Sequence, residues 1–465
     1  MKETNKTLYP LTPAQNMHHQ WIKTYKTQQV SGVSIVVALQ GVINIEVLKK
    51  AIKEEFKRYG CLRLRMTKPD KNGDVKQYLV QSDRRDIPLR DLSDMTMSEA
   101  DQTMQQWAYN TFDGDDIPLC EFFLMLLPDN YKGFFVHMDH RLIDSVGMGI
   151  MVDDILQLYS HYKFGTPMPE DLPDFEKVLQ DDLKKMENKK RFEKDKRFWD
   201  EQFDTLGEPL YSDFKGPSVL EASRKKHKNP KLRAADIELK DLFVTVKNYQ
   251  LEPEPTKRLM SFCRNTSLSP CNLLLLGLRT YLSKVNNGQE DITIQNFISR
   301  RSTHDEWRSG GSRTIMFPCR TVITPDTDFI SAAYEIQSTQ NKIYMHSNYD
   351  LQLIMDEVKK RYNIPDNTSY VSCYLTYQPA PLAVENDSLK GVPFHFHWFA
   401  NGAATKKMYL TVSHMPNGGM NYSFHYQPAC LDEKDIELLY YYLMRVLFTG
   451  IENPEITVGE LMEMV

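Results

Sequence analysis

The sequence predicts an α/β fold made of two lobes of similar plan. Its 465 residues are far more than one minimal core needs, so two domains are the default expectation. Amphipathic helices and strands of varied length alternate in both halves of the chain. A stretch rich in proline and glycine, KFGTPMPEDLPD at residues 163–174, is typical of a boundary. We therefore predict an N-terminal lobe over residues 1–165, a linker over 166–174 and a C-terminal lobe over 175–465.

The first half contains clear signals for individual elements. Thr12 is placed to cap a helix within residues 9–24, and Pro13 suits the first turn of that helix. Apolar residues at 3.6-residue spacing predict an amphipathic helix over residues 44–60. The other predicted elements are strands at 30–41 and 73–81, a helix at 97–112, a hairpin at 119–140 and a helix with one apolar face after residue 145.

The second half repeats this alternation. A long charged helix is predicted over residues 175–203, and two helices follow within residues 255–285. The sequence PNGG lies between two alternating apolar runs, which predicts a β-hairpin over residues 408–427. The remaining predictions are strands at 291–301, 312–324, 369–378 and 392–400 and a helix at 432–450.

Composition argues against several classes of protein. A net charge of -5 provides no general attraction to nucleic acids or anionic membranes. The start, MKETNKTLYPLTPAQ, lacks the apolar segment of a signal peptide, and runs such as CNLLLLGL are too short to span a membrane. The seven cysteines form no C-x-x-C pair. We therefore expect free thiols in a cytoplasmic protein, without zinc or disulfides.

One loop, DHRLIDS at residues 139–145, lies between a predicted strand and a predicted helix. Histidine is the side chain best able to accept a proton near neutral pH, and His140 is placed to point into a cleft. Asp144, four residues later, is better placed to turn back, meet a cation or backbone amides, and hold the loop. The spacing alone also fits an ordinary loop histidine followed by a capping aspartate.

Ordered motifs along the chain resemble those of the condensation domains of nonribosomal peptide synthetases, in the chloramphenicol-acetyltransferase-like acyltransferase superfamily. MDHRLIDS resembles the M-H-H-x-x-x-D-G motif, and RYGCLRLRM keeps three residues of R-H-E-x-L-R-T. The other matching segments, in the family's order, are LTPAQNMHHQW, FISRR, GSRTIMFPCR, HSNYDLQLI and NGGMNYSFHYQPACLDEKDIELL. The resemblance covers nearly the whole chain, and it implies a free-standing domain or one excised from a larger synthetase.

The resemblance implies two chloramphenicol-acetyltransferase-like lobes in a V-shaped pseudo-dimer with a central tunnel. His140 would lie at the tunnel centre and assist attack of an amine or hydroxyl on a thioester carbonyl, giving an amide or an ester. It would orient the nucleophile and take its proton, or stabilise the charged intermediate. The expected substrates are phosphopantetheine thioesters on an acyl or peptidyl carrier protein, or coenzyme A thioesters, with a small amine or alcohol as acceptor. The protein would act as a monomer, with no bound cofactor or metal.

Family members pair the motif aspartate with an arginine, and the resemblance makes Arg300 and Arg63 the candidates for Asp144, with Arg300 preferred. Two motif positions depart from the family. Asp139 replaces the first histidine; it would raise the pKa of His140 if it lay beside the ring, although strand alternation could direct it away. Ser145 replaces the family glycine and would add a hydroxyl donor or narrow the tunnel.

Gly147 is a further position of interest near this loop, and Ile315 replaces a family asparagine in the 311–320 strand. The substitutions leave open a non-catalytic member that recruits carrier proteins, and a coenzyme A-dependent O-acyltransferase. Two basic stretches, at 184–197 and 223–233, are either solvated surface or a docking surface for an acidic carrier protein.

Other histidines are interpreted as structural. His18 and His19 are predicted to form a pair on a helix surface, and His137 is predicted to pack in the core. His395 and His397 would share one strand face with aromatic side chains opposite. No third ligand at a suitable spacing accompanies them, so a metal site is not predicted.

Overall fold

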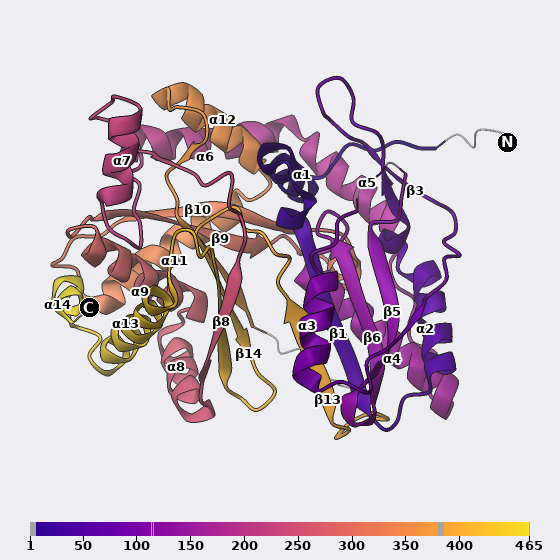
Figure 1. Cartoon of the computed structure of the whole chain (residues 1–465). Helices are drawn as coiled ribbons and strands as arrows, with labels where there is room; N and C mark the ends of the chain where they lie inside the picture. Colours follow the sequence, from indigo (N-terminus) through magenta and orange to yellow (C-terminus); the bar gives the residue numbers. More distant parts are fainter. Residues whose placement is uncertain (1–5, 113, 115, 380–385, 465) are drawn as a thin grey trace. The chain divides into compact units, whose positions relative to one another are not determined.

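The computed structural model describes residues 6–112, 114, 116–379 and 386–464 (Figure 1). The first five residues, where a signal peptide would begin, and the last residue of the predicted C-terminal lobe lie outside the described residues. Contacts divide the chain into two compact units. Unit 1 comprises Met1–Asn188, Ser299–Thr314 and Ala383–Ala403, and unit 2 comprises Lys189–Ile298, Ile315–Leu382 and Ala404–Val465. Two later segments thus join the first unit, while the lobe boundary at residues 166–174 stays a prediction.

Unit 1 contains a five-stranded sheet in the order β13-β1-β6-β5-β4. Its strands are β1 Gly32–Gln40, β4 Leu89–Asp91, β5 Cys120–Leu127, β6 Tyr131–Asp139 and β13 Phe394–Phe399. β5 and β6 form the predicted antiparallel hairpin, with its turn at Pro128–Asn130. β1 pairs antiparallel with both β6 and β13, so a late segment of the chain completes the edge of this sheet. A second, small sheet pairs β2 Leu64–Met66 with β3 Gln77–Leu79.

Helices cover both faces of the unit 1 sheet (Figure 1). α2 Ile45–Arg58 and α4 Ser145–Phe164 pack on one face, and α3 Met97–Trp107 packs on the other. Unit 1 also contains α1 Pro13–Tyr25 and α5 Phe175–Met186. The odd-numbered residues Ile35, Val37 and Leu39 of β1 join the core beneath α2 and α4. Their neighbours Val36 and Ala38 join the core beneath α3. This double burial explains why residues 35–39 of β1 form an unbroken apolar run rather than an alternating one.

Unit 2 contains a six-stranded sheet in the order β10-β9-β12-β14-β15-β8. Its strands are β8 Thr245–Leu251, β9 Asp291–Ser299, β10 Thr314–Val322, β12 Cys373–Gln378, β14 Met408–His414 and β15 Met420–Tyr426. β14 and β15 pair antiparallel, which confirms the hairpin predicted from PNGG. β12 runs parallel to both β9 and β14, so the sheet is mixed. A short pair, β7 Ala235–Asp236 with β11 Thr368–Ser369, lies apart from it.

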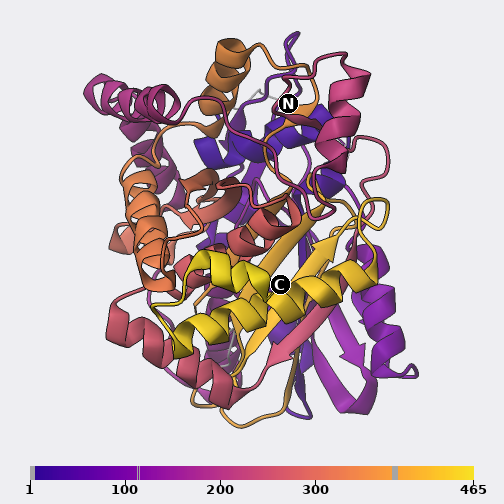
Figure 2. The ribbon, with the colours of Figure 1, turned by 90° about the vertical axis from the view of Figure 1, so that its left-hand side faces the viewer.

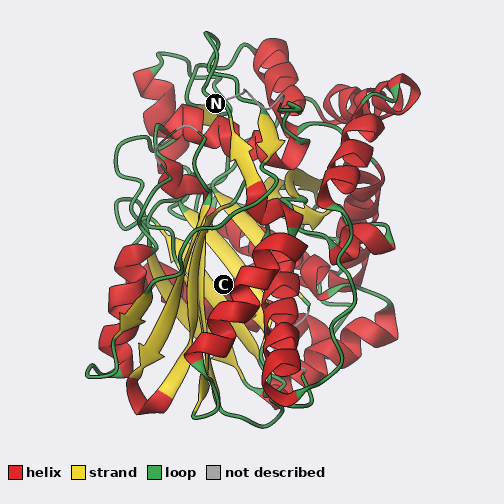
Figure 3. Ribbon diagram, turned by 90° about the vertical axis from the view of Figure 1, so that its right-hand side faces the viewer, coloured by secondary structure: helices red, strands yellow, loops and turns green. Residues whose placement is uncertain are grey.

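The helices of unit 2 are α6 Lys189–Leu206, α7 Ser218–Lys226, α8 Pro253–Thr266, α9 Pro270–Val285, α11 Phe329–Met345, α12 Leu351–Tyr362, α13 Glu433–Glu452 and α14 Val458–Glu463. The short helix α10 His304–Arg308 belongs to unit 1. α9 is buried on nearly all sides, and α13 lies against it (Figure 2). The close approach depends on Gly277, because a Cβ there would lie 2.4 Å from Leu443. Both units therefore have the predicted α/β composition (Figure 3).

One predicted element is wrong. The charged helix expected over residues 175–203 is two helices, α5 and α6, separated at Glu187 and Asn188. The break contains neither proline nor glycine, and charged residues continue through it, so the sequence gives no signal for it.

None of the helices within the described residues has the length and apolar character that crossing a membrane requires.

Candidate active site

The HxxxD loop joins β6 to α4 within unit 1 and is held by backbone hydrogen bonds. His140 N donates to Ser31 O at 2.6 Å, and Asp139 N donates to Leu119 O at 2.9 Å. The two apolar residues of the loop, Leu142 and Ile143, are fully buried. They fix the backbone between His140 and Asp144, so this part of the loop belongs to the core and is not a mobile surface turn.

The carboxylate of Asp144 accepts hydrogen bonds from several parts of unit 1. Its Oδ1 accepts from Gly147 N at 2.9 Å, which caps α4. Its two carboxylate oxygens accept from Arg301 at 2.7 Å each, and Oδ2 also accepts from Arg313 N at 2.9 Å and Thr314 Oγ1 at 3.0 Å. Burial would raise the pKa of Asp144, but Arg301 and the N–H donors lower it to about 2. The carboxylate is therefore ionised, and all of these donors are bound to it. This suits it for holding the loop in place.

The arginine that pairs with Asp144 is Arg301, and not Arg300 or Arg63. Arg300 is the neighbouring residue, and its N donates to Arg313 O at 3.1 Å. Successive side chains of an extended segment point to opposite sides, so two adjacent arginines left a one-residue ambiguity that the sequence did not resolve. Arg63 donates to the carbonyl oxygens of Phe56 and Lys57 and thus satisfies the C-terminal end of α2.

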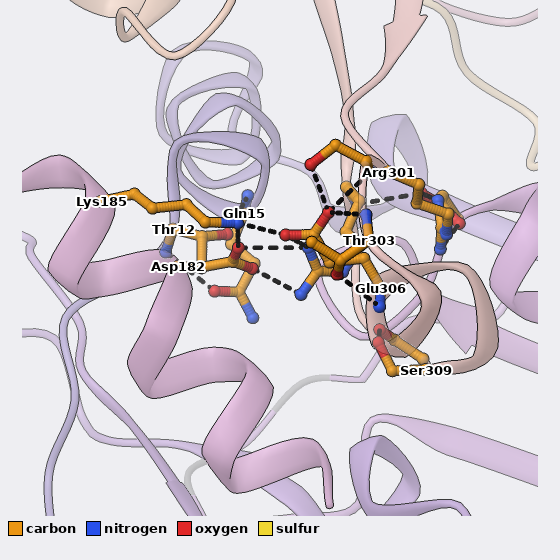
Figure 4. Close-up of polar contacts among 12 residues, drawn as sticks. Thr12, Gln15, Asp182, Lys185, Arg301, Thr303, Glu306 and Ser309 are labelled. Carbon is orange, nitrogen blue, oxygen red and sulfur yellow. Dashed lines mark hydrogen bonds and ion pairs between the residues drawn. The ribbon is translucent and has the colours of Figure 1, made fainter. Parts of the chain in front are cut away.

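The segment that carries Arg301 is held by a second buried carboxylate. Glu306 accepts from Ser302 N at 2.6 Å and Thr303 N at 3.0 Å, and it pairs with Lys185 of α5 (Figure 4). Burial opposes ionisation, but Lys185 and the Ser302 donors lower the pKa of Glu306 to about 2. Sequence reasoning missed this cluster, because Lys185 lies in a stretch that resembles solvated charge.

The carboxylate of Asp139 is occupied by Arg141. It accepts from Arg141 N at 2.8 Å, from Nε at 3.0 Å and from Nη2 at 2.6 Å, and both residues are buried. Ser31 Oγ donates to it at 3.4 Å. Gln15 of α1 donates to the carbonyl oxygen of Arg141 at 3.1 Å. The residue that replaces the family histidine therefore belongs to a satisfied ion pair that joins the loop to α1.

The imidazole of His140 stacks on another imidazole. Its ring lies 4.4 Å from the ring of His18, with an interplanar angle of 13°. Its Nδ1 is buried without a hydrogen-bond partner among the described residues. Burial lowers the pKa of His140 below its usual value, although Asp144 and Asp139 act in the opposite direction. The ring is therefore neutral at pH 7, which is the form that accepts a proton.

The predicted surface pair His18 and His19 is wrong, because both side chains are buried, with 3% and 5% of their surface exposed. His19 Nε2 lies 3.0 Å from Gly73 O. His18 follows Ala14 and Met17 at the helical spacing of one buried face, and this periodicity would have indicated its burial. Only the three-dimensional fold brings it to His140.

The remaining predicted positions lie at the start of α4 or in the core of unit 1. Ser145 is the first residue of α4 and is half-buried. Gly147 has no room for a side chain, because a Cβ would lie 2.8 Å from Ile143, and its carbonyl accepts from Tyr59 OH at 2.8 Å. His137 packs in the core as predicted, with Nδ1 2.7 Å from Ser34 Oγ. Over the described part of the chain, no three His, Cys, Asp or Glu side chains gather as a metal site.

The sequence is similar to those of known condensation domains and of a peptide synthase subunit. A family model described as "Condensation domain" matches residues 5–464. Surfactin synthase subunit 1 of Bacillus subtilis (strain 168) is 23% identical over 466 residues, covering 98% of this chain. This chain spans only 12% of the length of that synthase subunit.

Solved structures share the fold. The first condensation domain of the calcium-dependent antibiotic synthetase, in complex with a substrate analogue, has a TM-score of 0.77 at 17% identity, covering 98% of this chain and 99% of the other. A variant of the starter condensation domain of rhizomide synthetase, in complex with C8-CoA, has a TM-score of 0.77 at 16% identity, covering 97% of each chain. These likenesses confirm the predicted chloramphenicol-acetyltransferase-like fold class.

Proposed function

Since the chain belongs to the condensation-domain family, we propose that it is an acyltransferase in which His140 acts as the general base. The family catalyses amide-bond formation in nonribosomal peptide synthesis. The proposed reaction is attack of an amine or hydroxyl on a carrier-bound acyl thioester. The observation that carries the proposal is a neutral histidine on a loop whose neighbouring carboxylates are both occupied by arginines.

The chemistry asked of His140 is limited. A thioester is already activated, so the nucleophile needs orientation and a place for its proton. The nucleophilic nitrogen or oxygen bonds to the carbonyl carbon, His140 accepts the released proton, and the carbon–sulfur bond then breaks. The departing sulfur takes the proton and leaves as a thiol. Atoms and charge balance without any other reactant.

Asp144 is not proposed as a proton relay. Its carboxylate already accepts five hydrogen bonds, from the side chains of Arg301 and Thr314 and the backbone of Gly147 and Arg313. A carboxylate with a pKa of about 2 is a poor base at pH 7. Its proposed role is to hold the loop so that His140 is presented in one position.

Ser145 is proposed to affect the site through its position at the start of α4. It is half-buried and follows the Asp144 cap directly. Asp139 is proposed to be a supporting residue, since its buried carboxylate accepts hydrogen bonds from Arg141 and Ser31. An unpaired buried charge would destabilise the loop. Because Arg141 compensates the charge of Asp139, the change from the family residue argues against a motif that has lost its function.

The proposed partner is an acidic acyl or peptidyl carrier protein. Part of the predicted basic surface is neutralised within its own unit: Lys184 pairs with Asp181 at 3.3 Å, and Lys196 pairs with Asp200 at 2.6 Å. Lys189, Lys190 and Lys194 of α6 are exposed and make no ion pair with the described residues. These three lysines are the proposed contact for the carrier's acidic surface.

The experiment that tests the function compares the wild type with His140→Ala on matched donors. Acyl groups are offered on coenzyme A and on a phosphopantetheinylated carrier protein, each with a set of amines and alcohols. Product mass and released thiol are measured. We expect product with the wild type and a loss of about 10²- to 10⁴-fold in the variant. Unchanged turnover in a folded His140→Ala variant would remove His140 from the chemistry, and no product with any donor would favour a non-catalytic role.

The two donors also distinguish the proposed reaction from a coenzyme A-dependent O-acyltransferase. The likeness to a rhizomide synthetase domain that was solved with C8-CoA is the reason to include this donor. Ester product from coenzyme A donors, with none from the carrier-bound donor, would establish the alternative. Amide product from the carrier-bound donor would support the first proposal.

A further inference from the structure

α1 brings a second imidazole against the face of His140. The rings of His18 and His140 are 4.4 Å apart and nearly parallel, at 13°. Trp21, one helical turn further along α1, meets His18 edge-on at 4.9 Å and 76°. His18 is thus held between the tryptophan and His140, and only 3% of its surface is exposed.

The stacked geometry excludes a direct hydrogen bond between the two imidazoles. The N–H groups and lone pairs of an imidazole lie in the plane of its ring, so two parallel rings cannot point them at one another. The Nδ1 atoms of both histidines are buried without a hydrogen-bond partner among the described residues. His18 therefore contacts His140 through its face and does not pass a proton to it.

Charge reinforces this assignment. Two positive rings at this distance would repel strongly, so the pair carries at most one positive charge. Burial, followed by His140 and Arg141, lowers the pKa of His18 well below its usual value. The charged groups around His140 are Asp144 and Asp139, both paired with arginines, and these favour His140 as the ring that carries that charge.

We propose that His18 is a positioning residue that covers one face of the His140 imidazole, fixes the plane of the ring and excludes water from that face. The proposal rests on the proposed role of His140 as general base. Its consequence is that α1 contributes directly to the reactivity of the loop. Loss of the cover would let the ring rotate and would hydrate it, which favours its charged form.

The test uses two substitutions of His18 with different shapes. His18→Phe keeps a flat ring over His140, whereas His18→Ala removes it. If the alanine variant does not fold, His18→Leu takes its place, since leucine fills the volume without a flat face. His19→Ala is the matched control, because His19 is a buried neighbour on the same helix that contacts Gly73 and not His140.

Two readouts are taken on the full chain. NMR titration of labelled histidine, with the His140 signal assigned through His140→Gln, reports the pKa of His140 without any substrate. Steady-state kinetics over pH report kcat and KM on the donors that the wild type accepts. We expect His18→Ala to raise the pKa of His140, to shift the acidic limb of kcat to higher pH and to lower kcat by about 100-fold. We expect His18→Phe to resemble the wild type in both readouts.

Other outcomes would overturn the proposal. An unchanged pKa and kcat in folded His18→Ala would show that the stacked ring has no influence on His140. A loss in His18→Phe as large as in His18→Ala, with the pKa of His140 unchanged, would show that the His18 imidazole is itself required. If His140→Ala keeps full turnover, the proposed function fails, while the NMR titration still decides whether His18 controls His140.

Discussion

The carboxylate of Asp144 and the guanidinium of Arg301 form two hydrogen bonds of 2.7 Å, and both side chains are almost completely buried. Planar bidentate geometry is the arrangement in which arginine and carboxylate bind most strongly. The pair joins residues 157 positions apart in the chain. It therefore ties the HxxxD loop to the segment at residues 299–314 within unit 1.

Breaking this pair should be costly, because the surviving charge would remain buried. We expect Arg301→Ala to lower the free energy of unfolding by about 3–5 kcal/mol. Urea unfolding followed by circular dichroism measures this loss. Arg308→Ala is the matched control and should cost much less, because Arg308 lies in the same segment and makes only a surface pair with Glu170. Equal losses in the two variants would contradict the assignment of Arg301 as the partner.

The same pair should make stability depend on acid. The pKa of Asp144 is about 2 in the folded protein, against about 4 for a free aspartate. A lowered pKa contributes stability that is fully present above pH 4 and is lost as pH falls toward 2. Asp144→Asn cannot ionise, so the stability difference from the wild type should shrink over that range. Unfolding curves at pH 7, 4 and 2.5 measure it, and a constant difference would contradict the prediction.

Because Asp139 and Arg141 form a buried ion pair, we expect the stability effects of substituting them to depend on each other. Asp139→His, which introduces the family residue, leaves the buried guanidinium of Arg141 unpaired and should destabilise the protein by about 3 kcal/mol. Arg141→Leu alone leaves the buried carboxylate of Asp139 unpaired and should lower the free energy of unfolding by a similar amount. The double variant should cost less than the sum of the two, as a thermal-unfolding double-mutant cycle would show. Additive losses would mean that the pair is not coupled.

Glu55 of α2 should affect the pH dependence of stability in the opposite direction to Asp144. It is completely buried, and its carboxyl group lies beside that of Asp154. Burial, and then the neighbouring Asp154, raise its pKa well above the usual value. A raised pKa contributes stability below the unfolded value near pH 4, and this is lost as pH rises through the folded value.

Glu55→Gln cannot ionise, so it removes the loss of stability at higher pH while it keeps the shape of the side chain. The variant should be more stable than the wild type at neutral and alkaline pH, by roughly 1 kcal/mol or more. Glu54→Gln is the control, since Glu54 is a surface partner of Lys57 and should contribute under about 1 kcal/mol. Chemical unfolding at pH 5, 7 and 9 checks this. A gain that vanishes at pH 9 would contradict the sign.

The sequence was sufficient where the signals are local. The Thr12 cap, the β5–β6 hairpin and the Asp144 cap of α4 each depend on residues a few positions apart. Contacts between segments that are distant in the chain were harder to predict from the sequence. Arg301 was missed by one residue because two arginines are adjacent, and the Glu306–Lys185 pair joins segments 121 residues apart.

The stacking of His18 on His140 was missed for a further reason. Helical periodicity can show that His18 is buried, but nothing in the spacing shows which residue lies opposite. The break between α5 and α6 was missed because helix ends without proline or glycine depend on tertiary contacts, such as the Lys185 pair with Glu306.

The lowered pKa of His140 predicts the pH profile of turnover. A general base must be neutral, so the rate should fall as pH decreases through the pKa of His140. Because burial holds that pKa below the usual histidine value, the acidic limb should lie below about pH 6.5. Measuring kcat/KM from pH 4.5 to 8 on the preferred donor locates the limb. An acidic limb above pH 7 would mean that another group is titrating or that His140 is charged in the free protein.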